Sequence, residues 1–302
     1  MKVFISGATG HIGFAVASAF SRAGHQVYGL TRSKDRSALL ERNEIIPVVG
    51  DMQDISAYEK VLSPCQILIH CAADYSGETL LIDHNVVREL ISSAQQRGLQ
   101  RTIIYTSGSW VYGDTAEGVV DESSALNPPQ FVQRRVEVER MVLAANASNL
   151  CTLVIRPACV YGGGGSLTAL WFETAMRAGA ASFVGQGNNR WGMVHRDDLA
   201  QLYLRAAESG LGGEVFNATD RSRFTVEECA RAASWATGAG GKIKGIGLEE
   251  AREKFGVLTD GLLLNQHVDS SKAVRMLGWQ PRHGGFADGA EAYFRSWKAA
   301  AP

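Results

Sequence analysis

Three evenly spaced glycines lie between a strand pattern and a helix pattern at the start of the chain. Residues 2–6 are mostly apolar, and residues 11–23 carry apolar side chains at helical spacing. A glycine turn in this position lets the backbone approach a pyrophosphate, and the following helix offers free N–H groups and a partial positive charge. The turn therefore predicts a βαβ unit that binds a dinucleotide. The residues that we expect to hold it are Gly7, Thr9, Gly10, His11, Ile12 and Gly13.

Short apolar strand patterns alternate with helical patterns through the first half of the chain. Strands are predicted at residues 2–6, 26–30, 45–49, 66–71, 102–106 and 151–155. Helices are predicted between them, notably at residues 11–23, 79–97 and 131–147. Near-continuous apolar strands that alternate with helices are typical of a parallel sheet covered on both faces. The expected fold class is therefore α/β, with a doubly wound, Rossmann-like parallel sheet.

The pattern changes after about residue 156. Four consecutive glycines, residues 162–165, are followed by helical stretches that alternate with short strands such as residues 214–217. We expect residues 1–156 to form a nucleotide-binding domain whose sheet continues beyond it. Residues 157–302 are expected to form a smaller, mixed α/β lobe that binds the substrate and is not cleanly separable.

Composition excludes several classes of protein. The 302 residues include 30 Lys and Arg against 31 Asp and Glu, so the basic excess typical of nucleic-acid binding is missing. No apolar run approaches the roughly 20 residues that span a bilayer, and the N-terminus does not resemble a secretion signal. Five cysteines without C-x-x-C spacing predict neither a disulfide framework nor a metal site, and they fit the cytoplasm.

The end of the second predicted strand lacks the acidic residue that usually binds the ribose 2′-hydroxyl of NAD. Thr31, Arg32 and Ser33 stand there instead and are suited to surround a 2′-phosphate, with Arg32 as the cation. This favours NADP(H) as the cofactor; the alternative is that Arg32 is an ordinary exposed loop arginine. After the third strand, Asp51 and Met52 are placed to contact the adenine, or Asp51 serves as a cap.

Six motifs appear in order along nearly the whole chain. They are residues 7–13 (GATGHIG), 70–73 (HCAA), 105–113 (YTSGSWVYG), 156–162 (RPACVYG), 194–200 (VHRDDLA) and 277–281 (LGWQP). Together they resemble the extended short-chain dehydrogenase/reductase family, in its NAD(P)-dependent epimerase/dehydratase branch. The resemblance implies a nucleotide across the C-terminal ends of the strands and a small-molecule substrate between it and the C-terminal lobe. Cofactor contacts are implied for Ala72, Ala73, Thr106 and Pro157. A homodimer that pairs the helices near residues 79–97 and 131–147 is implied as well.

The catalytic positions depart from the family pattern, which has a tyrosine and a lysine four residues apart and a serine or threonine after the fifth strand. The stretch at residues 135–140 matches the residues that follow the family lysine, so Arg135 is equivalent to that lysine and Phe131 to the tyrosine. Counting back from the Val-Tyr-Gly motif makes Gly108 equivalent to the serine or threonine. None of the eight tyrosines has a lysine four residues later. Phe131 has no exchangeable proton, whereas Arg135 can still donate to the nicotinamide ribose. The main candidates to replace the missing acid are Ser107 and Tyr75.

Several aromatic and polar residues fall in segments that border the expected substrate space. They are Ser109, Trp110, Phe131, Tyr161, Trp171, Arg190 and His195. An aromatic lining suits an apolar or aromatic ligand. The alternatives are that the aromatic residues belong to the core, that Arg190 is simply exposed, and that His195 serves the entry of the next helix.

We therefore expect an atypical NADP(H)-dependent oxidoreductase that acts on a small apolar or aromatic carbonyl or enone. An activated double bond suits such a site because its reduction needs little help from an acid. Two alternatives stay open. One is a protein that binds NADP(H) as a sensor without turnover, and the other is a sugar-nucleotide epimerase or dehydratase with relocated catalytic groups.

Overall fold

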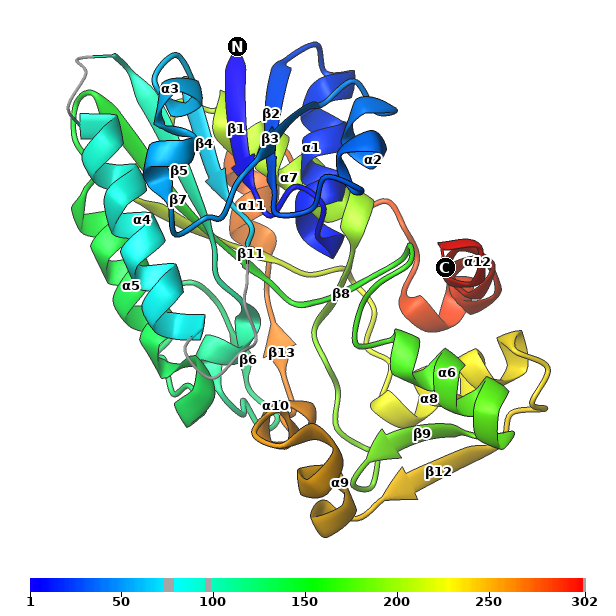
Figure 1. Cartoon of the computed structure of the whole chain (residues 1–302). Helices are drawn as coiled ribbons and strands as arrows, with labels where there is room; N and C mark the ends of the chain where they lie inside the picture. The colour runs from blue at the N-terminus through cyan, green and yellow to red at the C-terminus, as the bar shows by residue number, and fades with distance from the viewer. Residues whose placement is uncertain (73–78, 96–98, 301–302) are drawn as a thin grey trace.

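A computed structural model describes residues 1–72, 79–95 and 99–300 of the chain. Seven strands form one sheet, in the spatial order β11-β7-β5-β4-β1-β2-β3. The strands are β1 (Lys2–Ser6), β2 (Gln26–Thr31), β3 (Ile46–Val49), β4 (Ile67–His70), β5 (Arg101–Thr106), β7 (Leu150–Pro157) and β11 (Glu214–Ala218). Every pairing in this sheet is parallel, so all the carboxyl ends meet at one edge, which faces the C-terminal lobe in Figure 1. Ligands of open parallel sheets bind at this edge.

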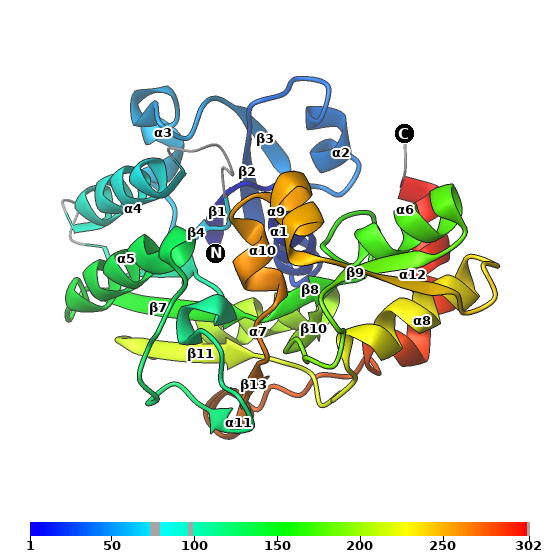
Figure 2. The ribbon, with the colours of Figure 1, turned by 90° about the horizontal axis from the view of Figure 1, so that it is seen from below.

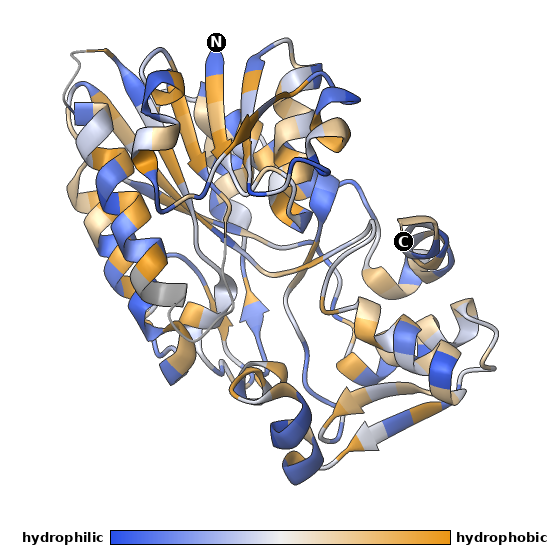
Figure 3. Ribbon diagram, viewed as in Figure 1, coloured by the Kyte–Doolittle hydropathy of each residue, from blue (hydrophilic) through white to orange (hydrophobic). Residues whose placement is uncertain are grey.

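Alternating side chains supply the two faces of the sheet. In β1, Val3 and Ile5 join one buried cluster and Phe4 joins the other. The first face is covered by α1 (His11–Arg22), α7 (Arg196–Glu208) and α11 (Ser271–Leu277), and the second by α4 (Thr79–Gln95) and α5 (Gln133–Ala144). Figure 3 shows the strands as a mostly hydrophobic layer between these helices. The predicted doubly wound, Rossmann-like fold is confirmed.

The C-terminal lobe is built around an aromatic core. Its main elements are α6 (Ala169–Ala178), β9 (Ala181–Val184), α8 (Val226–Ala236), β12 (Ile243–Ile246) and α12 (Phe286–Ala300). Trp171, Phe172 and Phe286 are almost fully buried there, and the ring centroids of Trp171 and Phe286 lie 5.1 Å apart. Three short parallel pairs bring distant segments together: β9 with β12, β8 (Cys159–Tyr161) with β10 (Met193–His195), and β6 (Val119–Val120) with β13 (His267–Val268).

The main sheet continues beyond residue 157. β11 pairs with β7 along its whole length, and buried side chains of α7 share one apolar cluster with those of α1. The chain that follows the first six strands of the sheet therefore completes the nucleotide-binding half rather than forming a separate unit.

Several short elements lie outside the predicted pattern. They are α2 (Ser37–Glu41), α3 (Glu59–Leu62), α9 (Leu248–Phe255), α10 (Leu258–Leu262) and the 3₁₀ turns η1 (Ile55–Ala57), η2 (Ser109–Tyr112) and η3 (Gln130–Val132). The helix expected at residues 131–147 begins with η3, continues as α5 and ends at Ala144. Figure 1 shows α9 and α10 below the sheet edge, and Figure 2, seen from below, shows them in front of it, between the two halves of the molecule. Among the described helices, none combines the length and the apolar character needed to cross a membrane.

Candidate active site

The glycine turn after β1 packs tightly against neighbouring backbone atoms. Gly7 has φ +70°, and a Cβ there would come within 2.7 Å of the backbone of Ala72 after β4. A Cβ on Gly13 would overlap the carbonyl of Gly7, and the Gly10 N–H donates to that carbonyl at 2.8 Å. Gly10 is also the N-cap of α1 and supplies no side-chain cap. The first N–H groups of α1 therefore face a tight turn with no room for a side chain at Gly7 or Gly13, which fits the pyrophosphate of a dinucleotide.

The turn after β2 carries a cation and two hydroxyls. Thr31 is buried, its Oγ1 lies 3.5 Å from Thr9 Oγ1, and it accepts a hydrogen bond from the Ser33 N–H. Arg32 between them is exposed and has no hydrogen bond or ion pair with any described residue. The segment after β3 is used differently: Asp51 Oδ1 accepts from the Gln53 N–H at 2.9 Å. Asp51 thus caps its own turn, one of the two roles that the sequence left open, and its contact with the adenine stays a prediction.

Met52 and Pro157 are two further residues that we expect to contact the cofactor. The Met52 carbonyl accepts a hydrogen bond from the buried Tyr58 hydroxyl at 2.6 Å. Pro157 ends β7, beside Gly108 at the end of β5. Ala73 and Tyr75, expected on the nicotinamide side, lie outside the described residues.

The three positions that depart from the family pattern lie together at the end of β5. Arg135 in the first turn of α5 donates from Nη1 to the Thr106 carbonyl at 3.2 Å and to the Ser107 carbonyl at 3.5 Å. Gly108 is extended, and a Cβ on it would meet only the Pro157 carbonyl at 3.8 Å, an ordinary contact. Phe131 in η3 packs edge to face on Trp110. Arg135 thus places a cation beside the carbonyls that follow β5, and Phe131 places an aromatic ring at the position where the resemblance predicts a tyrosine.

Two serines flank Gly108 and differ in what they bind. Ser107 is buried, and its Oγ has no hydrogen-bond partner among the described atoms. Ser109 is equally buried, but its Oγ donates to Gln266 Oε1 at 3.0 Å, while Gln266 Nε2 returns a bond to the Ser109 carbonyl at 2.9 Å. Ser109 is therefore committed to the packing of β13, whereas the Ser107 hydroxyl is left for a ligand or water.

Thr106 is also tied into the interior. Its Oγ1 accepts from the Tyr203 hydroxyl at 2.7 Å and donates to Cys71 Sγ at 3.3 Å. Only its backbone carbonyl, which is bound to Arg135, faces the candidate site.

The residues expected from the C-terminal lobe separate into different environments. Tyr161 and Trp171 are fully buried in the aromatic core; the Tyr161 hydroxyl donates to the Gly284 carbonyl at 2.6 Å. His195 Nδ1 accepts from the Asp197 N–H at 3.2 Å, which is the helix-entry role. Arg190 donates from Nε to the Arg223 carbonyl at 2.9 Å, away from β5. Trp110 and Phe131, both half-buried, are the aromatic candidates that the structure brings into contact with each other, and Trp110 lies close to the end of β5 along the chain.

His195, Asp197 and His283 bring ligand atoms within 4.8 Å of one another. The two imidazole rings stack, with centroids 3.6 Å and planes 16° apart. An imidazole binds a metal through a lone pair in its own ring plane. Two nearly parallel planes at this separation do not share an ion, so this cluster does not form a metal site in this arrangement.

A buried polar network behind the site had not been expected from the sequence. Ser6 Oγ lies 2.7 Å from His70 Nδ1, His70 Nε2 lies 2.7 Å from Asp83 Oδ1, and the Tyr105 hydroxyl donates to Asp83 Oδ2 at 2.5 Å. Burial opposes ionisation of Asp83, but its bond to His70 and the charge of Arg135 hold its pKa below the usual value. The network fixes the ends of β1, β4 and β5 against α4. The sequence signal that could have revealed this network is Asp83 itself, an acid on the otherwise apolar face of α4.

Residues 3–219 match the model of the NAD dependent epimerase/dehydratase family. The chain belongs to this family of NAD(P)-dependent enzymes. It is 28% identical over 293 residues to an uncharacterized protein of Schizosaccharomyces pombe, covering 94% of this chain and 96% of that one. It is 26% identical over 229 residues to 4-hydroxy-2-methyl-3-oxo-4-farnesyl-3,4-dihydroquinoline-1-oxide ketoreductase of Stigmatella aurantiaca, covering 73% and 68% of the two chains.

Solved structures share the whole fold. UDP-glucose 4-epimerase of Thermotoga maritima, with UDP-glucose, superposes with a TM-score of 0.84 at 20% identity and covers 99% of both chains. dTDP-glucose 4,6-dehydratase of Bacillus anthracis, in complex with NAD, gives the same TM-score at 18% identity, covering 99% of this chain and 97% of that one. At this identity the likeness extends to the fold alone.

Proposed function

We propose that this protein is an NADP(H)-dependent reductase or dehydrogenase for a small carbonyl or enone with an apolar or aromatic body. The observation that carries the proposal is the combination of two features at one sheet edge. One is the turn that has no room for a side chain at Gly7 or Gly13. The other is Arg135, a fixed cation at the end of β5. The first supports nucleotide binding, and the second supports an ordered ribose at the reactive end.

Charge at the end of β2 favours NADP(H) over NAD(H). No carboxylate stands among residues 31–33, and Arg32 has no partner among the described residues. A guanidinium without a partner stabilises a 2′-phosphate through charge-assisted hydrogen bonds. Thr31 and Ser33 add a hydroxyl on each side.

When bound, the nicotinamide supplies or accepts a hydride. Arg135 orients the ribose while its Nη1 keeps the bonds to the carbonyls after β5. Ser107 Oγ is the group that we assign to hydrogen-bond a substrate oxygen, because it is buried without a partner. Trp110 and Phe131 exclude water and hold an aromatic or apolar body. Phe131 transfers no proton, so the proton comes from solvent or from Tyr75.

The relatives support a reductase. The Stigmatella aurantiaca protein is named as the ketoreductase of a farnesyl dihydroquinoline oxide, a carbonyl compound with a large apolar body. Such a substrate matches the Trp110–Phe131 wall better than a sugar does.

A second function is favoured by one observation. Losing a positioned general acid typically slows proton transfer by a factor of about 10² to 10⁴, and Phe131 and Gly108 together remove the acid and its partner hydroxyl. The second candidate is therefore a protein that binds NADP(H) and senses its redox state without turnover.

Calorimetric titration with NADPH, NADP⁺, NADH and NAD⁺ tests the proposal. We expect NADPH to bind at least about tenfold, or about 1.4 kcal/mol, more tightly than NADH. Arg32→Ala removes this preference, and the matched control Arg36→Ala, an exposed arginine of the same loop, keeps it. Carbonyl and enone panels with NADPH then separate the reductase from the sensor, and UDP-glucose tests the epimerase alternative. Absence of nucleotide binding would overturn both NADP(H) functions.

A further inference from the structure

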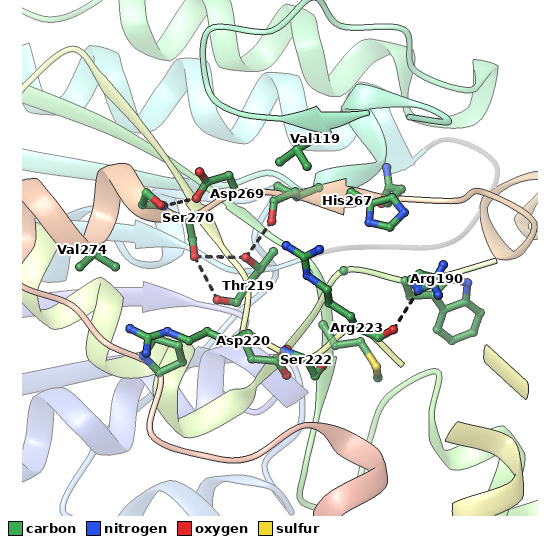
Figure 4. A pocket seen from close by; sticks show the side chains of 18 of the residues that line it. Val119, Arg190, Thr219, Asp220, Ser222, Arg223, His267, Asp269, Ser270 and Val274 are labelled. Carbon is green, nitrogen blue, oxygen red and sulfur yellow. Dashed lines mark hydrogen bonds between the residues drawn. The ribbon is translucent and has the colours of Figure 1, made fainter. Parts of the chain in front are cut away.

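A cavity of about 580 Å³ lies beside the edge strand β11 (Figure 4). Its walls come mainly from four segments: the loop after β11, the residues just before β10, the strand β13, and α11. Among the described residues, none that we expect to hold the nucleotide lines it. Its volume falls in the range of small-molecule sites.

The walls carry four arginines and two acids. The arginines are Arg190, Arg221, Arg223 and Arg275, and the acids are Asp220 and Asp269. Both acids accept hydrogen bonds from the protein. Asp220 Oδ1 accepts from the N–H and the hydroxyl of Ser222 at 2.9 and 2.6 Å, and its Oδ2 accepts from Tyr161 at 2.9 Å. Asp269 Oδ1 accepts from the Ser271 N–H at 2.5 Å.

The arginines, in contrast, are largely free to bind a ligand. Within the part of the chain that the structure describes, the guanidinium groups of Arg221, Arg223 and Arg275 make no hydrogen bond or ion pair. Arg190 uses only its Nε, which donates to the Arg223 carbonyl at 2.9 Å, the bond drawn in Figure 4. With four arginines and two acids in its walls, the cavity carries more positive than negative charge.

An imidazole adds a second unsatisfied group. His267 in β13 lines the cavity, and its Nε2 is removed from solvent with no hydrogen-bond partner among the described atoms. A buried ring nitrogen normally has a partner, and a missing one points to a ligand or bound water.

The walls are held in place before any ligand arrives. Thr219 Oγ1 donates to the Val268 carbonyl at 3.0 Å, and Ser270 Oγ donates to the Thr219 carbonyl at 3.1 Å. The Arg190 N–H donates to Asn265 Oδ1 at 2.9 Å. These bonds tie the loop after β11 to β13, so the arginines project from fixed backbone.

We propose that this cavity is a second ligand site that binds a small metabolite through a phosphate or carboxylate group. Planar guanidinium groups match the geometry of these oxyanions and bind them through paired hydrogen bonds. Arg223 in the loop after β11 and Arg275 in α11 bind the anion, Arg190 closes the side towards β10, and His267 donates to a neighbouring oxygen. The site is separate from the proposed nucleotide site and does not depend on it.

Calorimetry with pyrophosphate, inorganic phosphate and citrate at matched ionic strength tests the proposal on the full chain. At least one of these anions is expected to bind saturably, and the double variant Arg223→Gln/Arg275→Gln should weaken it at least tenfold. The control Arg140→Gln/Arg177→Gln removes the same charge from exposed arginines elsewhere and should change binding less than twofold. Tighter phosphate binding assigns a phosphate ester, and tighter citrate binding assigns a carboxylate.

The glycine turn after β1 also attracts phosphates, so the titrations are repeated with NADP⁺ present. Anion binding that persists in the presence of NADP⁺ and is lost only in Arg223→Gln/Arg275→Gln belongs to the cavity. Thermal unfolding without ligand checks that both double variants fold alike. The proposal is overturned if no anion binds below about 10 mM, or if the two double variants lose affinity equally.

Discussion

Phe131 meets Trp110 edge to face, with ring centroids 5.4 Å apart and planes at 72°. Phe131 stands where the resemblance predicts a proton-donating tyrosine, so on this assignment an apolar contact takes the place of an acid. Beside it Gly108 has room for a side chain and Arg135 keeps a cation in place. On the assignment made from the sequence, three positions of the expected catalytic set differ in chemistry from the family pattern: Gly108, Phe131 and Arg135.

Restoring the three family residues should restore acid catalysis. The triple variant Gly108→Ser, Phe131→Tyr, Arg135→Lys is expected to raise carbonyl reduction at least tenfold, since a positioned general acid contributes about 10² to 10⁴. Gly108 accepts a Cβ without a clash. Initial rates of NADPH oxidation with a carbonyl panel measure the effect, and Phe131→Leu serves as the apolar control. A triple variant that folds, binds NADPH and gains nothing contradicts the assignment of these positions.

Ser107→Ala should lower activity, whereas Ser109→Ala should lower stability. Removing the unpartnered Ser107 hydroxyl leaves the free energy of unfolding nearly unchanged but lowers kcat, because it deletes the bond to the substrate oxygen. Removing the Ser109 hydroxyl leaves Oε1 of the buried Gln266 without its hydrogen-bond donor and lowers stability by about 1–3 kcal/mol. Denaturant unfolding and steady-state kinetics on both variants separate the roles. Equal loss of stability in both would show that Ser107 is structural.

The glycine turn should tolerate no side chain. Gly13→Ala forces a Cβ against the Gly7 carbonyl, so the turn must open, and nucleotide affinity is expected to fall more than tenfold. Gly247→Ala is the matched control, because a Cβ there meets nothing within 4 Å and the φ angle is negative. Calorimetry with NADPH measures both. Unchanged affinity in Gly13→Ala would place the nucleotide elsewhere.

Two buried histidines should make the fold sensitive to acid. Burial, reinforced by His283, lowers the pKa of His195 to about 4, and burial, reinforced by Arg196, does the same for His11. Both are lower than in an unfolded chain, so between pH 6.5 and about 4 the unfolded state binds more protons. The contribution of the two neutral histidines to the free energy of unfolding is complete above pH 6.5 and is lost as the pH falls towards 4. Thermal unfolding across this range should show a shallower decline for His11→Asn/His195→Asn than for the parent chain.

Local patterns predicted the sheet and the nucleotide turn because both depend on short-range signals. The spacing of Gly7 and Gly13 and the apolar run of β1 carry that information within a dozen residues. The commitment of Ser109 to Gln266 depends on residues 157 positions apart, and Arg190 turns towards Arg223 only because of the loop after β11. Such contacts leave no periodic signal. The small elements α9 and α10 were missed for the same reason, since they are short and packed across the site.

The place of β11 at the edge of the sheet has a consequence for how the chain is made. Residues 214–218 pair with β7 and cover its free hydrogen-bonding edge, and α7 covers the apolar face over α1. A nascent chain that has emerged only as far as β7 exposes both surfaces, and an uncovered strand edge invites pairing with other chains. The nucleotide-binding half therefore reaches its final form only after more than two hundred residues have left the ribosome. Fragments that stop near residue 156 are expected to aggregate rather than fold.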